Sequence, residues 1–122
     1  MSITVYGIKN CNSMKKTFDF LQACDVAYEF FDYKKQVVSQ ATFEEWVAVF
    51  GLDKVINKQG TTYRKLDDTA KTLLASADVG AIYQLVAENQ SIIKRPIIAG
   101  THLEKDVALI GYVTQAMQHT FS

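Results

Sequence analysis

The segment YGIKNCNSMKK, Tyr6–Lys16, places one cysteine between a short apolar run and the predicted start of a helix. The unpaired N–H groups at a helix N-terminus carry partial positive charge, which stabilises a thiolate and lowers the pKa of a cysteine. Lys9 and Lys15 could add to that effect. Because the thiolate is the reactive form, we predict that Cys11 is a nucleophile. The alternative, a thiol that only packs, stays open for Cys11 and is the preferred interpretation of Cys24, near the end of the same helix.

Two arginines are the other candidates for chemistry. The guanidinium of Arg64 or Arg95 presents a fixed fork of donors to a carboxylate or oxyanion, and both residues lie in segments that could return to the strand ends near Cys11. Most arginines are solvated surface residues, so position alone gives them weak support. Pro96, the only proline, follows Arg95, and a cis bond there would expose the preceding backbone to an extended, peptide-like ligand.

Neither a metal site nor an internal disulfide is expected. The two cysteines have no partner Cys or His at ligand spacing, and a closed zinc site needs four ligands. If residues 12–24 form a helix, the rise of ~1.5 Å per residue separates Cys11 from Cys24 by roughly 20 Å. A disulfide tolerates only ~7 Å between Cα atoms, so the two thiols are predicted to stay separate.

Length, charge and composition narrow the class of protein. The 122 residues are 48% hydrophobic, which suits one domain with a sizeable core. Thirteen basic and thirteen acidic residues cancel, so neither nucleic acid nor an anionic membrane is expected as a partner. The sequence contains no phosphate-loop pattern, no signal peptide and no run of ~18 apolar residues. We therefore expect a cytoplasmic protein, and a monomer, because the core can consume every apolar stripe.

The N-terminal third has the pattern of a βαβ unit. SITVY is a β-rich run, the next apolar residues fall at helical spacing over 12–24, and VAYEFFDY has strand length and composition. Asn12 or Ser13 is placed to cap the helix. A strand, a helix and a strand in this order favour a right-handed unit with parallel strands.

Helical patterns then replace strands over about 39–90, with a polar loop, KVINKQGTTYRK, in the middle. Two apolar runs follow, PIIAG and VALIGY, and we expect the second to return as a strand antiparallel to the first. Residues 113–120 suit a closing helix. The order β-α-β, helices, β-β-α predicts an α/β, thioredoxin-like domain over 1–122, with a small mixed four-stranded sheet and a helical insertion. The expected helix caps in the insertion are Ser39 or Thr42 for the first helix, Asp67 for 68–75 and Asp78 for 79–88.

Several segments in order carry a resemblance to a known family. They are YGIKNC with Lys15-Lys16, then DYKK, NKQGTTYRKL, SIIKRPI and LIGY, and together they span nearly the whole chain. The chain closely resembles the arsenate reductase-like (ArsC/Spx) family and, within it, the small YffB-type proteins. The resemblance implies a thioredoxin-like fold in which Cys11 is the catalytic cysteine, and it maps Arg64 and Arg95 onto two family arginines that flank it.

The resemblance also implies a glutathione-dependent thiol reductase without a tightly bound cofactor. Glutathione is the expected co-substrate, the other substrate is an oxidised thiol or an oxyanion, and a glutaredoxin is a candidate partner. Asn57, Lys58, Gly60 and Thr61 match the family loop, where we expect loop shape and ligand contact. The residues predicted to bind substrate or glutathione around Cys11 are Arg64, Arg95, Lys9, Asn12, Lys15, Lys58 and Pro96.

Two departures from the family limit the transfer of function. Arsenate reductases of this family use a third arginine after the Arg-Pro segment, and the present chain has none after Arg95. Redox-sensing Spx regulators carry Cys-x-x-Cys, but Met14 occupies the second position here and cannot close that disulfide. An arsenate reductase and a non-catalytic, Spx-like regulator that binds RNA polymerase are the two alternatives to the thiol reductase.

Overall fold

A small sheet with two helices and a separate group of short helices form the two units of the chain. The computed structural model describes residues 2–121. The first unit comprises the chain up to Gln36 together with the chain from Arg95 onward, and the second comprises Val37–Lys94. The helical insertion predicted over about 39–90 lies within the second unit.

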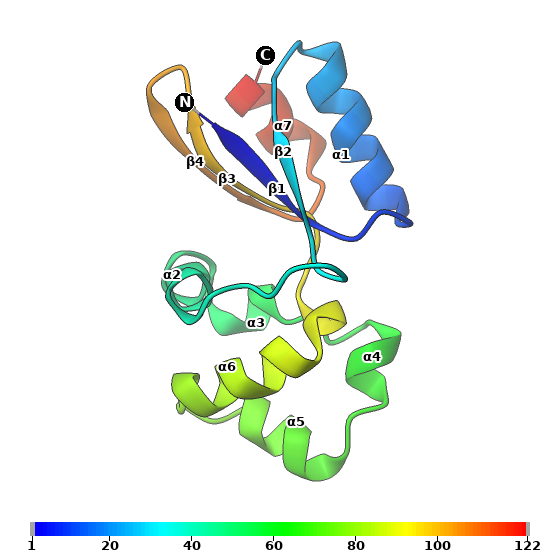
Figure 1. Ribbon diagram of the computed structural model, residues 1–122, viewed down its shortest axis with the longest axis vertical. Helices are drawn as coiled ribbons and strands as arrows, with labels where there is room; N and C mark the ends of the chain where they lie inside the picture. Colours follow the sequence, from blue (N-terminus) through cyan, green and yellow to red (C-terminus); the bar gives the residue numbers. More distant parts are fainter. Residues whose placement is uncertain (1, 122) are drawn as a thin grey trace. The chain divides into compact units, whose positions relative to one another are not determined.

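The first unit is built on a mixed four-stranded sheet with the order β2-β1-β3-β4 (Figure 1). Strands β1 (Ile3–Gly7) and β2 (Glu29–Asp32) are parallel. Strands β3 (Ile97–His102) and β4 (Lys105–Ile110) form a hairpin, and β3 runs antiparallel to β1. The predicted parallel pair, the antiparallel return and the thioredoxin-like α/β fold are therefore confirmed.

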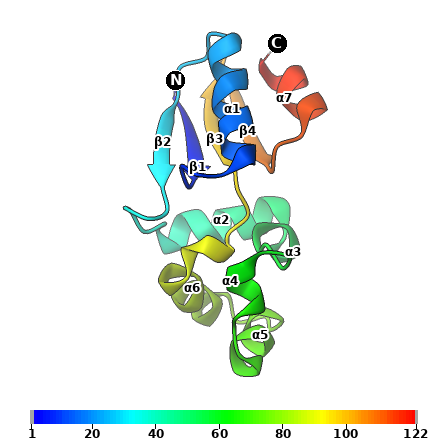
Figure 2. The same cartoon turned by 90° about the vertical axis from the view of Figure 1, so that its right-hand side faces the viewer.

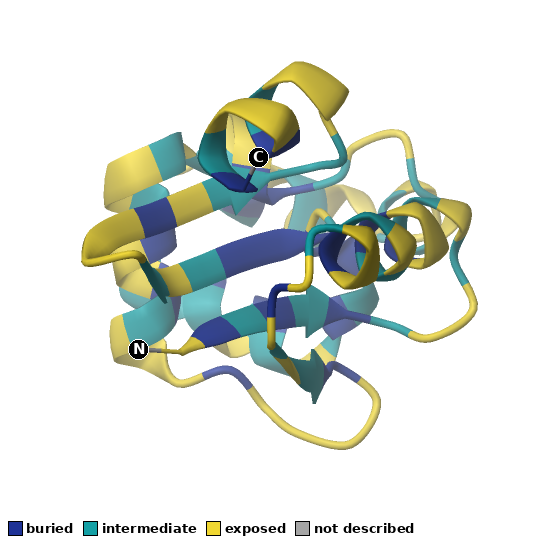
Figure 3. Cartoon of the chain, turned by 90° about the horizontal axis from the view of Figure 1, so that it is seen from above, coloured by how far each residue is buried: buried dark blue, intermediate teal, exposed yellow. Residues whose placement is uncertain are grey.

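Helices α1 (Asn12–Ala23) and α7 (Thr114–Phe121) cover one face of this sheet (Figure 1). Alternate strand residues point to that face, and the helices bury their apolar stripes against them. Figure 3 shows the exposed outer surfaces of the helices beside the buried bands of the strands. The buried members of this core are Ile3, Val5, Met14, Leu21, Val26, Ile98, Val107, Met117 and Phe121.

The regular elements of the second unit are helices, joined by short loops (Figure 2). Its helices are α2 (Gln40–Phe50), α3 (Leu52–Val55), α4 (Thr61–Arg64), α5 (Asp68–Leu74), α6 (Val79–Glu88) and the 3-10 turn η1 (Gln90–Ile92). The predicted caps are confirmed, because Ser39 accepts from the N–H of Thr42, Asp67 from that of Ala70 and Asp78 from that of Ala81. Helix α5 ends one residue before the predicted boundary.

Hydrogen bonds between distant segments close the second unit. The buried side chain of Gln90 accepts from the N–H of Val38 at 2.7 Å, and the hydroxyl of Tyr83 donates to the carbonyl of Val38 at 2.6 Å. The N–H of Asn57 donates to the carbonyl of Ile92 at 2.7 Å. These bonds satisfy buried backbone groups that short helices leave without a helical partner.

Two local predictions were wrong. Helix α1 has Cys11 itself as its N-cap residue, with extended backbone (φ −144°, ψ 134°), whereas Asn12 or Ser13 was expected to cap. No side-chain oxygen caps this end of α1, and its N–H groups at Ser13 and Met14 face the Cys11 sulfur instead. The segment expected to be a loop between α2 and α5 includes the helical turns α3 and α4, because 54–65 is too polar to show an apolar period over so few residues.

Candidate active site

Cys11 lies where β1 delivers the chain to the N-terminus of α1. The carbonyl of Cys11 accepts the first helical hydrogen bond, from the N–H of Lys15 at 3.0 Å. Its side chain is half-buried, in contact with the core that α1 and the sheet form. The thiol therefore stands at the end of the helix where backbone N–H groups point outward.

The surroundings of Cys11 favour its thiolate. Burial raises the pKa of the Cys11 thiol, but hydrogen bonds from the backbone N–H groups of Met14 and Ser13 lower it, as do the hydrogen bond and the positive charge of Arg95. The lowering effects win, and the pKa lies below its ordinary value. The predicted contribution of the helix N-terminus thus takes the form of two specific N–H donors.

Arg95 reaches Cys11 because of the sheet register. Ile97 at the start of β3 pairs with Tyr6 near the end of β1, so the residues just before β3 lie at the sheet edge from which the Cys11 loop departs. The guanidinium of Arg95 donates a hydrogen bond to the thiol, and the Arg95-Pro96 peptide bond is cis. Pro96 is buried next to this pair in the chain. The structure therefore brings Cys11, Arg95 and Pro96 to one edge of the sheet.

Two tyrosines lie at the end of β1, and one of them, Tyr33, is close to Arg95. The N–H of Tyr33 donates to the carbonyl of Gly7 at 2.8 Å, which holds Tyr33 against the end of β1. Burial raises the pKa of the Tyr33 hydroxyl strongly; nearby Tyr6 also raises this pKa, and the charge of Arg95 lowers it. Phe31 packs against both tyrosines, with ring centroids 5.0 Å from Tyr6 and 6.4 Å from Tyr33. The phenol of Tyr33 is therefore a neutral, buried group at the arginine.

The remaining predicted residues of the first unit are exposed. Lys9 lies in the loop before Cys11, Asn12 is the first residue of α1, and Lys15 is in its first turn. Their side chains are accessible to a ligand that approaches the thiol. Sequence analysis expected Lys9 and Lys15 to help lower the pKa of Cys11. The groups that shift this pKa are Met14, Ser13 and Arg95, and neither lysine is among them.

Arg64 and Lys58 belong to the second unit. Arg64 is the exposed last residue of α4, and Lys58 forms an exposed ion pair with Asp53 at 3.1 Å. The side chain of Asn57 accepts from the N–H of Gln59 at 3.3 Å, and Gly60 leads into α4. Asn57 and Gly60 therefore shape this loop, while Lys58, Thr61 and Arg64 are exposed on it.

Cys24 lies at the opposite end of α1, as its C-cap residue, and neither cysteine forms a disulfide. It is half-buried against the core of the first unit. Since α1 separates the two thiols by its full length, the described chain offers Cys11 no resolving thiol within reach.

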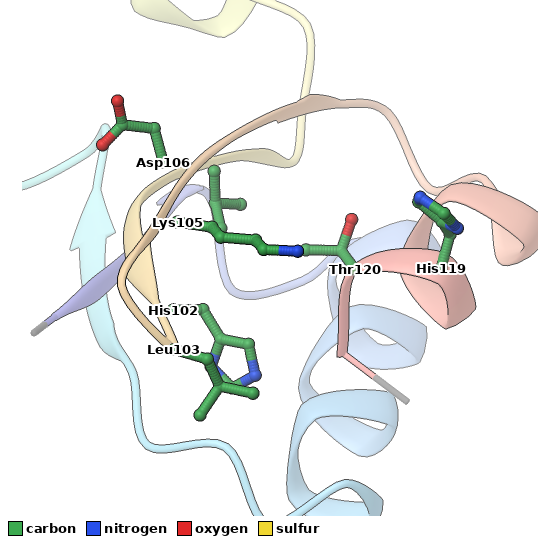
Figure 4. A pocket seen from close by; sticks show the side chains of 7 residues that line it. His102, Leu103, Lys105, Asp106, His119 and Thr120 are labelled. Carbon is green, nitrogen blue, oxygen red and sulfur yellow. The ribbon is translucent and has the colours of Figure 1, made fainter.

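A hollow of about 380 Å³ lies at the far edge of the sheet from Cys11, between the β3–β4 hairpin and the end of α7 (Figure 4). His102, Lys105 and His119 line it, and the ring of His102 packs on Phe121 with centroids 5.1 Å apart. Thr101 donates its N–H to Ser2, so this edge faces the start of β1. The hollow contains no cysteine or arginine and is separate from the candidate active site.

Two further observations concern metal ions and membranes. Within residues 2–121, no group of three His, Cys, Asp or Glu side chains is arranged to hold a metal ion. None of the helices in this part of the chain combines the length and apolar character that crossing a bilayer requires.

Sequence reasoning missed Tyr33; it expected N–H donors at the helix N-terminus without naming Ser13 and Met14. Tyr33 belongs to the DYKK segment, which was recognised as a family segment without a role for any single residue. Its signal is a tyrosine directly after a strand that is parallel to β1, because parallel strands end at the same edge of a sheet.

Comparison with known proteins identifies the family of the chain. The ArsC family model matches residues 6–120, and the chain belongs to the ArsC family. An uncharacterized protein of Haemophilus influenzae strain Rd is 36% identical over 98% of this chain and 99% of its own length. A solved structure named YFFB protein is 34% identical, covers 99% of this chain and all of its own, and superposes with a TM-score of 0.85. An arsenate reductase-related protein from Brucella melitensis is 30% identical, covers 99% of this chain and 95% of its own, and has a TM-score of 0.67.

Proposed function

We propose that this protein is a thiol reductase that uses Cys11 as its single nucleophile and glutathione as its co-substrate. The observation that carries the proposal is the thiol of Cys11, half-buried at the N-terminus of α1 and hydrogen-bonded by Ser13, Met14 and Arg95, all of which stabilise the thiolate. Membership of the ArsC family and the arsenate reductase-related relative support redox chemistry at this site.

The reaction is two thiol–disulfide exchanges. The Cys11 thiolate attacks the glutathione sulfur of a mixed disulfide, forms a Cys11–glutathione disulfide and releases the other thiol as a thiolate that takes up a proton. A second glutathione thiolate then attacks the glutathione sulfur of this intermediate, yields oxidised glutathione and restores Cys11. The external thiol is needed because Cys24 lies at the other end of α1. The substrate is reduced by two electrons, which two glutathione sulfurs supply.

The neighbouring cations would bind glutathione rather than react. Glutathione carries two carboxylates, which suit the exposed ammonium groups of Lys9 and Lys15 and the guanidinium of Arg95. Asn12 can donate from its side-chain amide, and buried Pro96 lines the edge on which an extended ligand would lie. Arg64 and Lys58, exposed on the second unit, are proposed as further carboxylate ligands.

The test is glutathione-dependent reduction of the mixed disulfide of glutathione and 2-mercaptoethanol, with Cys11→Ser and Cys24→Ser as a matched pair. We expect Cys11→Ser to lose at least about 1000-fold in rate, because the nucleophile is gone, and Cys24→Ser to keep nearly full activity. Activity that persists in Cys11→Ser would refute the proposal. Equal rates with glutathione and with cysteamine, which has no carboxylate, would refute its glutathione part.

The proposed role of Arg64 in glutathione binding is tested by comparing Arg64→Gln with a substitution at the adjacent Lys65. Arg64→Gln should raise the KM for glutathione about threefold to tenfold with little change in kcat, as expected when a charged hydrogen bond to substrate is removed. Lys65→Gln, a change at the next exposed cation of the same segment, is the control. Equal effects of both variants would reduce the role of Arg64 to general charge attraction.

Arsenate is the second candidate substrate, favoured by the name of the Brucella melitensis relative. The chain contains only two arginines, Arg64 and Arg95, and none after Pro96 to complete an oxyanion site of three. Glutathione oxidation that depends on arsenate and on Cys11 would establish this activity, and its absence at millimolar arsenate would eliminate it. If Cys11 supports neither reaction, capture of RNA polymerase by both the natural protein and Cys11→Ser would identify a binding module instead.

A further inference from the structure

Tyr33 is a buried polar group that the proposed reaction leaves without a role. Its side chain is 6% exposed, and its hydroxyl oxygen is fully covered. Burying a hydroxyl costs free energy unless polar neighbours compensate for the lost water. A phenylalanine would fill nearly the same volume without that cost, so the hydroxyl calls for an explanation in terms of its neighbours.

Those neighbours are the end of β1 and Arg95. The N–H of Tyr33 donates to the carbonyl of Gly7 at 2.8 Å. Gly7 in turn abuts Arg95, since a Cβ placed on Gly7 would lie 3.4 Å from the Cβ of Arg95. Tyr33 is thus held by its backbone at the glycine that the arginine packs against.

The electrostatic interaction between Arg95 and the Tyr33 hydroxyl agrees with this proximity. The guanidinium of Arg95 is close enough to the Tyr33 hydroxyl to lower its pKa, although burial and Tyr6 raise that pKa far more. The phenol therefore stays neutral at every working pH. A neutral phenol oxygen has lone pairs that attract a guanidinium, and the Nε atom of Arg95 is itself covered from solvent. The Nε side of the arginine is therefore enclosed, while its guanidinium donates a hydrogen bond to the thiol.

We propose that Tyr33 is a positioning residue that acts through Arg95, because its buried side chain holds the guanidinium where that group donates to the Cys11 thiol. The groups that act directly on the thiol are the Met14 and Ser13 backbone and Arg95, and Tyr33 is not among them. Its effect is therefore indirect. This inference deepens the proposed function, on which it rests only for the role of Cys11 as nucleophile.

The test is the pH profile of Cys11 alkylation by iodoacetamide, read by mass spectrometry with Cys24 scored in the same sample. Tyr33→Phe keeps the ring that packs on Phe31 and removes only the hydroxyl. We expect the pKa of Cys11 to rise in this variant and alkylation below that pKa to slow about twofold to threefold, because a weakly held arginine stabilises the thiolate less. Arg95→Gln should slow it more, and the double variant should match Arg95→Gln alone.

Tyr28→Phe is the matched control. Tyr28 belongs to the same unit, stacks on Phe18 with centroids 5.3 Å apart, and accepts from the side chain of Gln22 at 3.4 Å. Loss of its hydroxyl should leave the Cys11 profile unchanged.

Three results would overturn the inference. One is an unchanged profile in Tyr33→Phe while Arg95→Gln shifts it, another is a further slowing in the double variant, and the third is a Tyr33→Phe protein that no longer unfolds cooperatively. The last would show that the hydroxyl serves the fold. Alkylation needs neither glutathione nor a disulfide substrate, so failure of the reductase proposal in the enzyme assay would leave this result separately interpretable.

Discussion

The two ends of helix α1 each hold a half-buried cysteine, yet only Cys11 receives hydrogen bonds that stabilise a thiolate. Cys11 is the N-cap residue and receives hydrogen bonds from the N–H groups of Ser13 and Met14. Cys24 is the C-cap residue, and its own N–H donates to the carbonyls of Phe20 and Gln22. At one end the backbone presents donors to the sulfur, and at the other end it presents acceptors.

This difference indicates that burial alone does not separate the two thiols. Both side chains are half-buried and both contact the same core. The two thiols differ in their surroundings. Cys11 lies at the helix N-terminus, where N–H donors point outward, and next to Arg95, and a thiolate is stabilised by hydrogen-bond donors and positive charge. Four experiments test this difference between the two ends of α1.

The largest effect is expected in the natural protein. At pH 7 we expect iodoacetamide to modify Cys11 about 10 to 30 times faster than Cys24, because a lowered pKa increases the thiolate fraction and a reduced nucleophilicity partly offsets it. Peptide mass spectrometry of a time course measures both rates. In urea the ratio should fall toward one, and a ratio that persists there would assign the difference to local sequence rather than to the fold.

Gly7→Ala should damage the donor end of α1 without changing any charge. The added Cβ would overlap the Met14 sulfur and lie 2.6 Å from its methyl carbon, and Met14 is fully buried. We expect a loss of about 1–2 kcal/mol in unfolding free energy and a rise in the pKa of Cys11 as the Met14 N–H shifts. Urea unfolding and the alkylation profile measure the two effects.

Gly80→Ala in α6 is the control for that change. Its nearest atoms lie 3.8 Å from the added Cβ, so the substitution should be neutral or slightly stabilising. Equal losses from the two substitutions would refute the Met14 explanation.

Arg95→Gln should make Cys11 behave more like Cys24. The substitution removes the positive charge and weakens the hydrogen bond to the thiol, so the pKa of Cys11 should rise. Its alkylation at pH 7 should slow about fivefold, because solvent screens the interaction at a half-exposed thiol. The rate for Cys24 should stay constant. A similar slowing of both thiols would indicate a general loss of structure.

The smallest effect concerns stability and pH. Because the folded pKa of Cys11 is lowered, its thiolate stabilises the fold above the unfolded pKa of ~8.5, and this contribution is lost as pH falls through the folded value. Between those two values, Cys11→Ser should flatten the rise of unfolding free energy with pH. The change should stay under about 1 kcal/mol for a half-exposed group. Cys24→Ser is the control, and an equal flattening there would remove the link to the helix end.

Local sequence signals predicted much of the fold. Asp67 and Asp78 were expected as caps, and each accepts from the N–H three residues on, because a cap is a contact within one turn. The helical turns α3 and α4 were not predicted. Each has only four residues, which is too short for a periodic pattern of apolar residues to show in the sequence. At the site, Cys11 was recognisable from its place before a helix.

Residues close along the chain were enough to predict a cysteine with basic neighbours at the start of a helix after a strand. Which cation reaches the thiol depends instead on tertiary contacts. Sheet register brings Arg95 to Cys11, and strand β2 ends beside Gly7 to place Tyr33 at that arginine. Pairing between distant strands depends on how the whole core packs, and no local pattern encodes it.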